Sequence, residues 1–436
     1  MVRHDKRSEG LSTVTAITFA VGTMIGAGVF VLSGLVIDTA GPGALFSYII
    51  CAVLVTFSGL SYASLASIFP EDGGGYLYAE KMLGKYPGFL TGWIMYIAQP
   101  IALSFILLGF GIYLNLLLST SIDPRLFAVL ALMLVTMLNI RGIAEAGKFE
   151  FSVVVTKVSI LIVFSIIGIL QLQSSVFEMS LPHGTSGVFQ GVTMVFFAYM
   201  GFQVITMMGG EVKESSRKVP LAMLASIVIV AIIYIGVILA LLAANLPNYG
   251  SESVFDAAMV LVGPIGSAII ALGAVLSTLS SANALTAGAS RITMEMASEK
   301  QIPGRFAKLR HKQPTNAIIL GSGVALLFIV YGRLDTIIGL VNSAQIIAMF
   351  FVNVSAYVLT RNESYVDSKK HWFKLPFGPL FPVLGALSCV IISLTLAPQA
   401  IILGFIALFL GSVLYMVEDT PEGEKEVEKI KEALKR

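Results

Sequence analysis

Charged side chains are scarce in this chain. Asp, Glu, Lys and Arg make up 12% of its 436 residues, whereas 56% are hydrophobic. A soluble domain carries about 25% charged residues, which give it a polar surface. This composition therefore excludes a soluble globular protein. Apolar runs long enough to cross a bilayer, about 20 residues each, recur from Leu11 to Val417, so lipid should be the main solvent.

Cysteine and histidine are also scarce. Cys51 and Cys389 are the only two cysteines, and each lies within an apolar run, which argues against a disulfide framework. The four histidines lie in predicted loops or the N-terminal tail, and no acid pair falls within a predicted span. An enzyme needs converging catalytic groups or a metal cluster. We therefore expect no enzymatic activity, no bound metal and no organic cofactor.

The apolar runs predict an all-α polytopic membrane protein with 12 transmembrane helices. We expect spans near residues 12–37, 43–69, 87–118, 124–141, 146–172, 187–211, 219–245, 264–297, 314–332, 335–360, 379–397 and 399–417. The third and eighth runs exceed the thickness of a bilayer, so these helices should tilt or extend beyond it. A short amphipathic helix is expected at Ser253–Val262, between the seventh and eighth spans.

Lys and Arg are distributed unevenly among the connecting segments. If the N-terminus is cytoplasmic, all but three of the 28 basic residues lie in or beside cytoplasmic segments. Arg125 and Arg333 then fall outside, and Lys157 belongs to neither side. Cytoplasmic loops carry the excess of basic residues in membrane proteins. We therefore expect a multi-pass protein of the cell membrane with both termini in the cytoplasm.

Lys157 lies inside the fifth predicted span, within the run VVTKVSILIVF. It follows Lys148, near the cytoplasmic end, by enough residues to lie about 13 Å deep. A charge there costs at least about 2.5–3.5 kcal/mol, and this depth hinders snorkelling to the interface. Lys157 should therefore face a polar interior, where burial favours reversible proton loss near neutral pH. The alternative is a lysine held permanently by backbone carbonyls.

Two predicted spans carry glycines at mid-depth. Gly26 and Gly28 flank Ala27 in the first span, and Gly201 lies in the sixth. These residues favour local unwinding, and unwound backbone in a membrane must line a cavity. The freed N–H groups of Ala27 and Gly28 would begin a second half-helix and attract a carboxylate. Paired interruptions in matching spans indicate the central site of a transporter, whereas each glycine alone could serve helix packing.

Ordered motifs extend over most of the chain. They are GTMIGAGVF, PEDGGGYLYAEKMLGKYPGFLTGW, FFAYMGFQVI, EVKESSRKVP, SRITMEMASEKQIPGRFAK and PTNAI. In this order they resemble the amino acid–polyamine–organocation (APC) superfamily of transporters, and within it the proton-coupled prokaryotic amino acid permeases. One departure is Ser215-Ser216, where many members have Asn-Pro, and it bears on the conformation of that loop.

The resemblance implies a leucine-transporter-like fold. Its core is a 5+5 inverted repeat with broken helices 1 and 6, to which two peripheral helices are added, and it works by alternating access. The implied parts are a cytoplasmic N-terminal tail (1–11), a first repeat (12–172), a second repeat (187–361), peripheral spans (379–417) and a charged cytoplasmic tail (418–436). The resemblance leaves the oligomeric state open.

The resemblance also implies a substrate site. In such transporters the substrate carboxylate meets backbone amides at the first break, which here are those of Ala27 and Gly28. The carbonyls implied to meet the substrate amine are those of Met24, Phe197, Ala198 and Met200. Phe197 also stands where members often place an aromatic ring over the substrate.

Lys157 resembles the fifth-span lysine of proton-coupled members. Related transporters hold a sodium ion at this spot, between spans 1 and 8. Protonated Lys157 would replace that ion and reach the Gly22 carbonyl and the Ser277 hydroxyl, with Ser281 as a second candidate. The resemblance therefore implies a proton, and not sodium, as the coupling ion.

The residues expected in the pocket wall are mainly apolar: Met24, Ile25, Phe197 and Met200, with Ile97 as a further candidate. No acidic side chain lies near either break, so we expect neutral amino acids, although cation–π contact with Phe197 leaves arginine or a polyamine open. We expect proton-coupled symport of a small-molecule amino acid across a lipid bilayer, and no nucleic-acid partner. Amino acid exchange with a purely structural Lys157 is the alternative, and a channel or membrane enzyme is a remote one.

Overall fold

The computed structural model describes residues 12–142, 147–174, 181, 183–310, 313–362 and 373–418. Within these ranges the regular elements are helices, and a single isolated bridge joins Arg310 and Gln313. In the described part of the chain, eight helical stretches are long and apolar enough to cross a membrane, and three further apolar helices are shorter. The chain is therefore a polytopic α-helical membrane protein. The expected N-terminal tail, 1–11, lies outside the described residues, and so does all of the expected tail 418–436 except residue 418.

The helices follow the predicted runs to within a few residues at most ends. Their bounds are α1 (Thr13–Met24), η1 (Gly28–Leu32), α2 (Ser33–Ala40), η2 (Gly41–Gly43), α3 (Ala44–Ile68), α4 (Gly75–Leu83), α5 (Lys85–Leu118), α6 (Pro124–Ile140), α7 (Gly147–Leu170), α8 (Gly184–Tyr199), α9 (Val204–Met207), η5 (Gly209–Glu211), α10 (Ser215–Ala244), α11 (Ser253–Leu261), α12 (Pro264–Ser298), η6 (Gly304–Phe306), α13 (Thr315–Tyr331), α14 (Leu334–Arg361), α16 (Leu380–Ser393) and α17 (Pro398–Glu418). The expected amphipathic helix is present as α11, whereas the short α4 is absent from the predicted elements.

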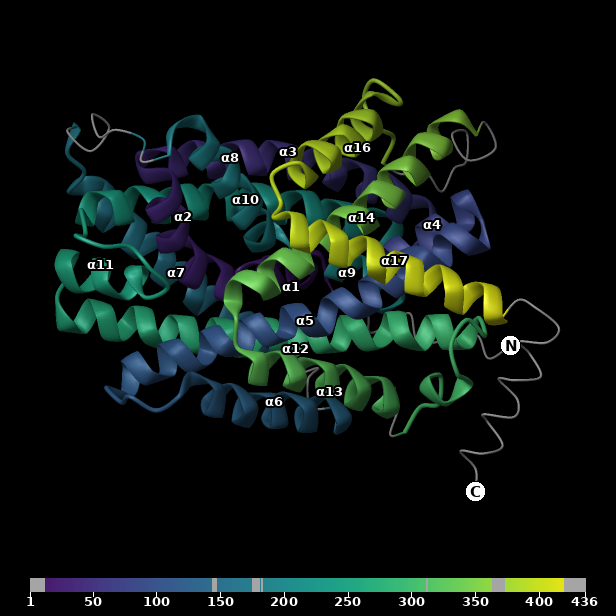
Figure 1. Ribbon diagram of the computed structural model, residues 1–436, viewed down its shortest axis with the longest axis horizontal. Coiled ribbons are helices and arrows are strands. Elements are labelled where there is room, and N and C mark those ends of the chain that lie inside the picture. The colour runs from purple at the N-terminus through teal and green to yellow at the C-terminus, as the bar shows by residue number, and fades with distance from the viewer. Residues whose placement is uncertain are drawn as a thin grey trace.

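The two longest helices, α5 and α12, pack against each other across the middle of the molecule (Figure 1). Their 34 and 35 residues match the third and eighth runs, which are longer than a bilayer is thick. In Figure 1, α11 and α4 lie at opposite ends of the bundle, and α17 ends on the α4 side. The segments expected on opposite sides of the membrane therefore lie apart in the fold.

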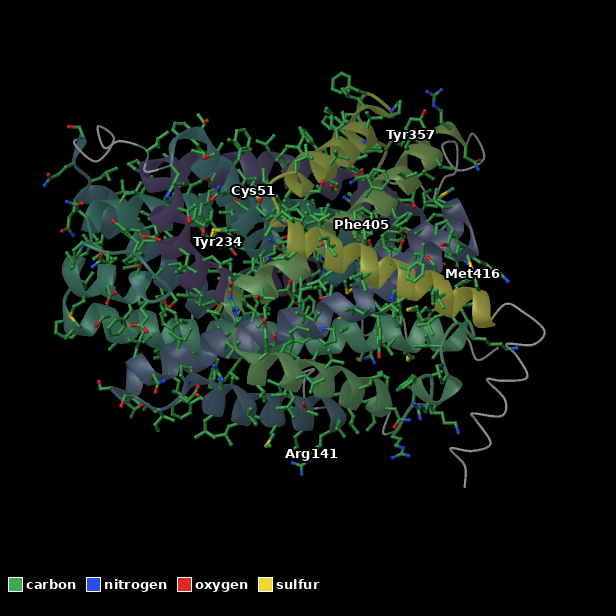
Figure 2. The ribbon with its side chains drawn as sticks, in the orientation of Figure 1. Cys51, Arg141, Tyr234, Tyr357, Phe405 and Met416 are labelled. Atoms are coloured by element: carbon green, nitrogen blue, oxygen red, sulfur yellow. The ribbon has the colours of Figure 1, made fainter. Side chains whose placement is uncertain are left out.

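The last helix lies at the periphery. In the most apolar window of Pro398–Met416, 17% of the residues are buried within the protein, against 89% for Thr13–Ile68. Phe405 and Met416 lie on α17 (Figure 2), and each exposes more than half of its surface. Such large exposed apolar side chains are suited to contact with lipid.

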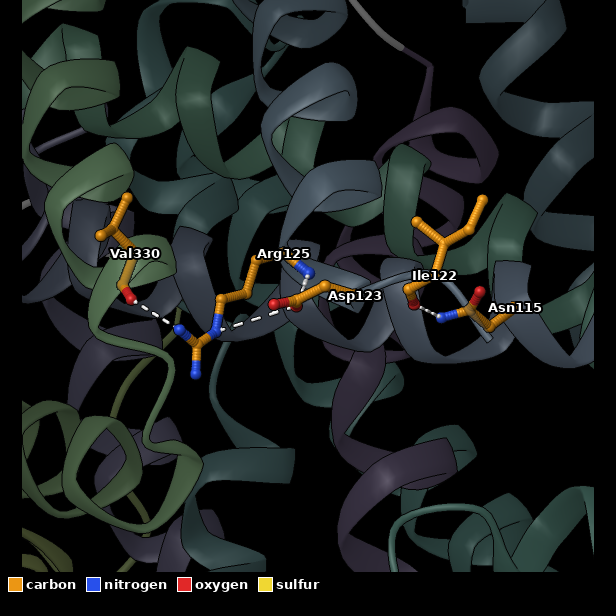
Figure 3. A network of polar contacts seen from close by, with 5 residues as sticks. All are labelled: Asn115, Ile122, Asp123, Arg125 and Val330. Atoms are coloured by element: carbon orange, nitrogen blue, oxygen red, sulfur yellow. Dashed lines mark hydrogen bonds and ion pairs between the residues drawn. The ribbon is translucent and has the colours of Figure 1, made fainter. Parts of the chain in front are cut away.

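A polar network ties α5, α6 and α13 together at one end of the bundle (Figure 3). The Asp123 carboxylate accepts a hydrogen bond from the Arg125 backbone N–H at 2.9 Å, which caps the start of α6. The Arg125 guanidinium donates to the Val330 carbonyl at 3.3 Å, near the end of α13. A cation at a helix C-terminus meets the negative end of the helix dipole. Arg125, one of the few basic residues expected outside, therefore has a structural role.

The first predicted break is present, but it lies slightly earlier than expected. α1 ends at Met24, and Ile25 leaves the helical region with φ −79° and ψ 81°. Gly26 follows as a bend, and a π-helical segment begins at Gly28 and continues into α2. The unwound residues are thus Ile25 and Gly26, whereas Gly28 lies at the start of the second half-helix.

The second predicted break is centred on Gly201. α8 ends at Tyr199, and Met200 is extended with φ −61° and ψ 150°. Gly201 has φ +118°, a conformation that side-chain-bearing residues rarely adopt, and α9 begins at Val204. The sixth predicted span therefore divides into two helical pieces around this glycine.

The two breaks contact each other. The Thr23 hydroxyl donates to the Gly201 carbonyl at 3.1 Å, so a side chain of the first break satisfies backbone of the second. A Cβ added to Gly28 would lie 2.8 Å from the Ala198 Cα, and one added to Gly201 would lie 2.8 Å from the Thr23 carbonyl oxygen. Real Cβ atoms do not approach backbone this closely. Glycine at both positions therefore lets the breaks meet.

Gly201→Ala should destabilise the protein by about 1–3 kcal/mol, because it combines a strained φ with a clash against the Thr23 carbonyl. Thermal unfolding of the purified protein in detergent measures this as a melting temperature lowered by several degrees. Gly323→Ala in α13 is the matched control, because its added methyl group meets open space. Equal melting temperatures for the two variants would contradict the strain assigned to Gly201.

Candidate functional site

A pocket lies where the two breaks meet. It holds about 510 Å³ of space between atoms, including the part open to solvent. The residues that line it are Thr23, Met24, Gly26, Ala27, Gly28, Gln99, Ala102, Ile106, Phe197, Ala198, Met200, Gly201, Gln203, Val204, Leu285, Val341 and Gln345. They come from both broken spans and from α5, α12 and α14, so helices far apart in the sequence build one cavity.

The structure brings the residues implied for substrate contact together in this pocket. All six line it: Met24, Ala27, Gly28, Phe197, Ala198 and Met200. Ile25 and Ile97, which we expected in the wall, are absent from the lining, and α5 contributes Gln99, Ala102 and Ile106 in their place. The expectation for Ile97 is off by part of a helical turn, because hydropathy does not fix the rotation of a uniformly apolar helix.

The first break offers a half-helix N-terminus to the pocket. The segment that begins at Ala27 and Gly28 leads through η1 into α2, and the first N–H groups of any helix have no partner within that helix. These donors and the helix dipole favour a negatively charged group. The backbone geometry therefore suits a carboxylate at this end of the pocket.

The carbonyls of the two breaks are linked by Tyr234 of α10, a residue that sequence reasoning missed. Its hydroxyl lies 2.8 Å from the Met24 carbonyl oxygen and 2.9 Å from that of Ala198. The hydroxyl has one proton, so it donates to one of them at a time or shares it. The Met24 carbonyl oxygen also accepts from the Gly26 backbone N–H at 2.9 Å. A carbonyl oxygen has two lone pairs, so the Met24 oxygen can accept a hydrogen bond from a bound ammonium group when Tyr234 donates to Ala198.

Tyr234 is fully buried inside the bundle (Figure 2) and is positioned by two other tyrosines. Its ring lies 5.8 Å from that of Tyr48 and 5.2 Å from that of Tyr199, measured between centroids. Edge-to-face and tilted ring pairs at these distances are attractive. A lone tyrosine in the apolar run of the seventh span was the available sequence signal.

A ring from α5 packs against Phe197. The Phe105 and Phe197 centroids are 4.5 Å apart in an edge-to-face arrangement. Phe197 is nearly buried and lines the pocket, so Phe105 limits the positions that the Phe197 ring can take. The pocket thus has an aromatic wall of defined orientation.

Lys157 lies beside the first break and is fully buried. Its ammonium donates to the Gly22 carbonyl and to the Ile25 carbonyl, each at 2.8 Å. Both carbonyls belong to the C-terminal end of α1, where the helix dipole favours a positive charge. The expected Gly22 contact is present, and the Ile25 contact adds to it.

Three serines of α12 surround the same carbonyls. Ser280 receives a hydrogen bond from Lys157 at 3.4 Å, Ser277 donates to the Ile25 carbonyl at 2.6 Å, and Ser281 donates to the Gly22 carbonyl at 2.8 Å. Ser277 and Ser281 were the predicted partners, and sequence reasoning missed Ser280. Ser277 and Lys157 both donate to the Ile25 carbonyl. The cluster therefore joins α7, the end of α1 and α12.

The pocket is electrically neutral apart from its helix ends. Neither Asp nor Glu is among the described residues that line it. In the described part of the chain, no group of three or more His, Cys, Asp or Glu side chains could hold a metal ion. The arrangement offers donors for an anion at one break, acceptors for a cation at both breaks, and an apolar wall with three glutamines.

The sequence is similar to known transport proteins over nearly its whole length. A family model described as amino acid permease matches residues 11–417. A methylthioribose transporter of Bacillus subtilis is 28% identical, with 87% of each chain covered. A branched-chain amino acid permease of the same organism is 27% identical, covering 94% of this chain and 93% of the relative. A serine/threonine exchanger of that organism is 27% identical, over 85% and 87%.

Tyr234→Phe should lower stability by about 1–3 kcal/mol, because it removes a buried hydroxyl that links the two breaks. Thermal unfolding in detergent should show a lower melting temperature. Tyr331→Phe, at the half-exposed end of α13, is the control and should change it little. An unchanged melting temperature for Tyr234→Phe would mean that the hydroxyl does not hold the breaks together.

Proposed function

The chain belongs to the amino acid permease family, and we propose that it is a proton-coupled symporter of neutral amino acids. In this proposal, the substrate binds in the pocket between the two breaks, and Lys157 takes up and releases the coupling proton. The observation that supports it most is the position of Lys157. A fully buried ammonium bonds the backbone of the same break that lines the pocket.

The fold that we propose has twelve crossings, built as a leucine-transporter-like 5+5 inverted repeat with two peripheral helices and both termini in the cytoplasm. The first candidate span, Thr13–Ile68, is long enough for two crossings, and α6, α13 and α16 are apolar helices of shorter length. Two interrupted helices, at α1 and α8, support the repeat. The clustering of basic residues supports the orientation.

Protonation of Lys157 would strengthen the hydrogen bonds that hold the end of α1 against α7 and α12. The ammonium has three donors and a full charge, and it lies among two carbonyls of the first break and a serine of α12. A neutral amine has fewer donors and loses its attraction to the helix C-terminus. Proton loss should therefore loosen the end of α1, and a substrate bound to the same break would bias the same equilibrium.

The pocket favours a zwitterion without a charged side chain. Its helix N-terminus at Ala27 and Gly28 suits the α-carboxylate, and the carbonyls of Met24 and Ala198 suit the α-ammonium. A second ammonium or a guanidinium would need a carboxylate in the wall, and no acidic side chain lines it among the described residues. We therefore favour neutral amino acids over cationic amino acids and polyamines.

Amino acid exchange is the second candidate, because one similar protein is a serine/threonine exchanger. In an exchanger, Lys157 would be a permanent structural cation in the place where related transporters hold sodium. The two functions differ in their need for an internal amino acid.

Purified protein in empty proteoliposomes should accumulate a radiolabelled neutral amino acid when an inward proton gradient is imposed in sodium-free buffer. The driving force is the proton gradient, which Lys157 couples to transport in this proposal, so dissipating the gradient with a protonophore should abolish accumulation. Uptake that occurs only when the vesicles contain amino acid would establish exchange and reject symport.

Lys157→Met should reduce proton-driven accumulation by at least about tenfold, the size of an effect of about 1.4 kcal/mol, because methionine keeps the packing but binds no proton. The Gly22 and Ile25 carbonyls keep their hydrogen bonds from Ser281 and Ser277, so the variant should remain folded by size-exclusion chromatography. Lys308→Met, at an exposed loop lysine, is the matched control. Full proton-driven accumulation by Lys157→Met would overturn the assigned role.

A further inference from the structure

One polar side chain in the pocket is left without a partner. Gln99 of α5 is 2% exposed, and its side-chain nitrogen, Nε2, meets no hydrogen-bond acceptor among the described residues. A buried donor that loses its bond to water costs about 1–3 kcal/mol. Such a cost inside a ligand pocket is accounted for if a ligand supplies the acceptor.

The other two glutamines of the pocket are used differently. The side-chain oxygen of Gln203 accepts a hydrogen bond from the Gly201 backbone N–H at 3.2 Å, which supports the second break. Its side-chain nitrogen faces the side-chain oxygen of Gln345 at 3.5 Å. Gln203 thus supports the second break and donates a hydrogen bond to Gln345, whereas Gln99 has no hydrogen bond with either of them.

Gln99 also lies at the boundary with a second cavity. This side cavity, between α5, α12 and α13, holds about 360 Å³ of space between atoms, including the part open to solvent. Gln99 and Leu285 line both cavities. A ligand group that reaches Gln99 from the central pocket would therefore point towards additional space.

Two hydroxyls of α12 that line the side cavity donate their protons within their own helix. Thr286 donates to the Ala282 carbonyl at 2.8 Å, and Ser290 donates to that of Ala287 at 2.8 Å. Each proton is used within α12, as is common for Ser and Thr in apolar helices. Gln99 therefore supplies an unused N–H donor at the boundary between the cavities, whereas these two α12 hydroxyls already donate to backbone carbonyls of their own helix.

The distance along α5 indicates which part of a substrate reaches Gln99. A Cβ added to Gly109 would lie 2.8 Å from the Ala27 Cβ, so Gly109 marks the level of the first break. Gln99 is ten residues earlier, about 15 Å along the helix axis. Ala102 and Ile106 lie between them on the face that lines the pocket. A carboxylate at Ala27 is thus far from Gln99, and only a side chain can extend towards it.

We propose that Gln99 determines side-chain specificity: its Nε2 donates a hydrogen bond to an acceptor on the substrate side chain. The substrates would be neutral amino acids with a side-chain amide oxygen, and glutamine, which has a longer side chain than asparagine, should use the side cavity best. This inference rests on the proposed function, because it requires an amino acid in the central pocket. It replaces the sequence-based expectation of a purely apolar side-chain site.

A site that donates a hydrogen bond to a substrate should reject an apolar molecule of the same shape, because the donor is then left buried and unpaired. Two nearly isosteric pairs test this: asparagine against leucine, and glutamine against methionine. Binding to the purified full-length protein is measured by isothermal titration calorimetry. The wild type should bind the polar member of each pair at least about tenfold more tightly.

Gln99→Leu should remove that preference. Its Kd for asparagine and glutamine should rise at least about tenfold, whereas its Kd for leucine and methionine should stay the same or fall, since no donor is left unpaired. Gln171→Leu, at an exposed glutamine, is the matched control and should keep the preference. A Gln99→Leu protein that weakens both members of each pair equally would make Gln99 structural and overturn the proposal.

The wild-type measurement alone decides the inference if Gln99→Leu does not fold. A wild type that binds leucine and methionine as tightly as asparagine and glutamine rejects the role of Gln99 but leaves amino acid transport intact. A wild type that binds none of the common amino acids rejects the proposed function, and the Gln99 inference with it.

Discussion

Backbone polar groups inside a membrane have no water to bond, so each helix break must be satisfied by the protein around it. This constraint explains the most unusual contacts of the structure. Thr23 bonds the Gly201 carbonyl, Tyr234 bonds the carbonyls of both breaks, and Lys157 bonds those of Gly22 and Ile25. The breaks are therefore held open by side chains from several helices, and the space between them becomes the pocket.

The same carbonyls connect stability with the proposed coupling. Ile25 is the unwound residue of the first break, and its carbonyl accepts hydrogen bonds from Lys157, Ser277 and Ser281. A change in the charge of Lys157 therefore acts on the backbone that forms one wall of the substrate pocket. No long pathway is needed, because residues 22 to 28 contact the lysine cluster on one side and the pocket on the other.

The pocket combines general and specific recognition. Helix ends and carbonyls suit the charges that all amino acids share, since they come from the backbone and from its two breaks. Side chains from α5, α12 and α14 complete the wall, and of these Gln345 is joined to the second break through its hydrogen bond with Gln203. Similar proteins are named for different amino acids, and they include a branched-chain amino acid permease and a serine/threonine exchanger. A backbone site combined with a variable side-chain wall is consistent with this difference.

The membrane class, the approximate helix bounds, both breaks and the polar surroundings of Lys157 follow from the sequence, because they depend on hydropathy, on glycine and on the high cost of a buried charge. Tertiary structure decided which α12 serine accepts a hydrogen bond from Lys157. It also decided that Tyr234 joins the breaks, and that Gln99 rather than Ile97 faces the pocket. A uniformly apolar helix has no preferred face, so its rotation is set by packing against its neighbours. Local patterns therefore located the site along the chain, and only packing chose the side chains that complete it.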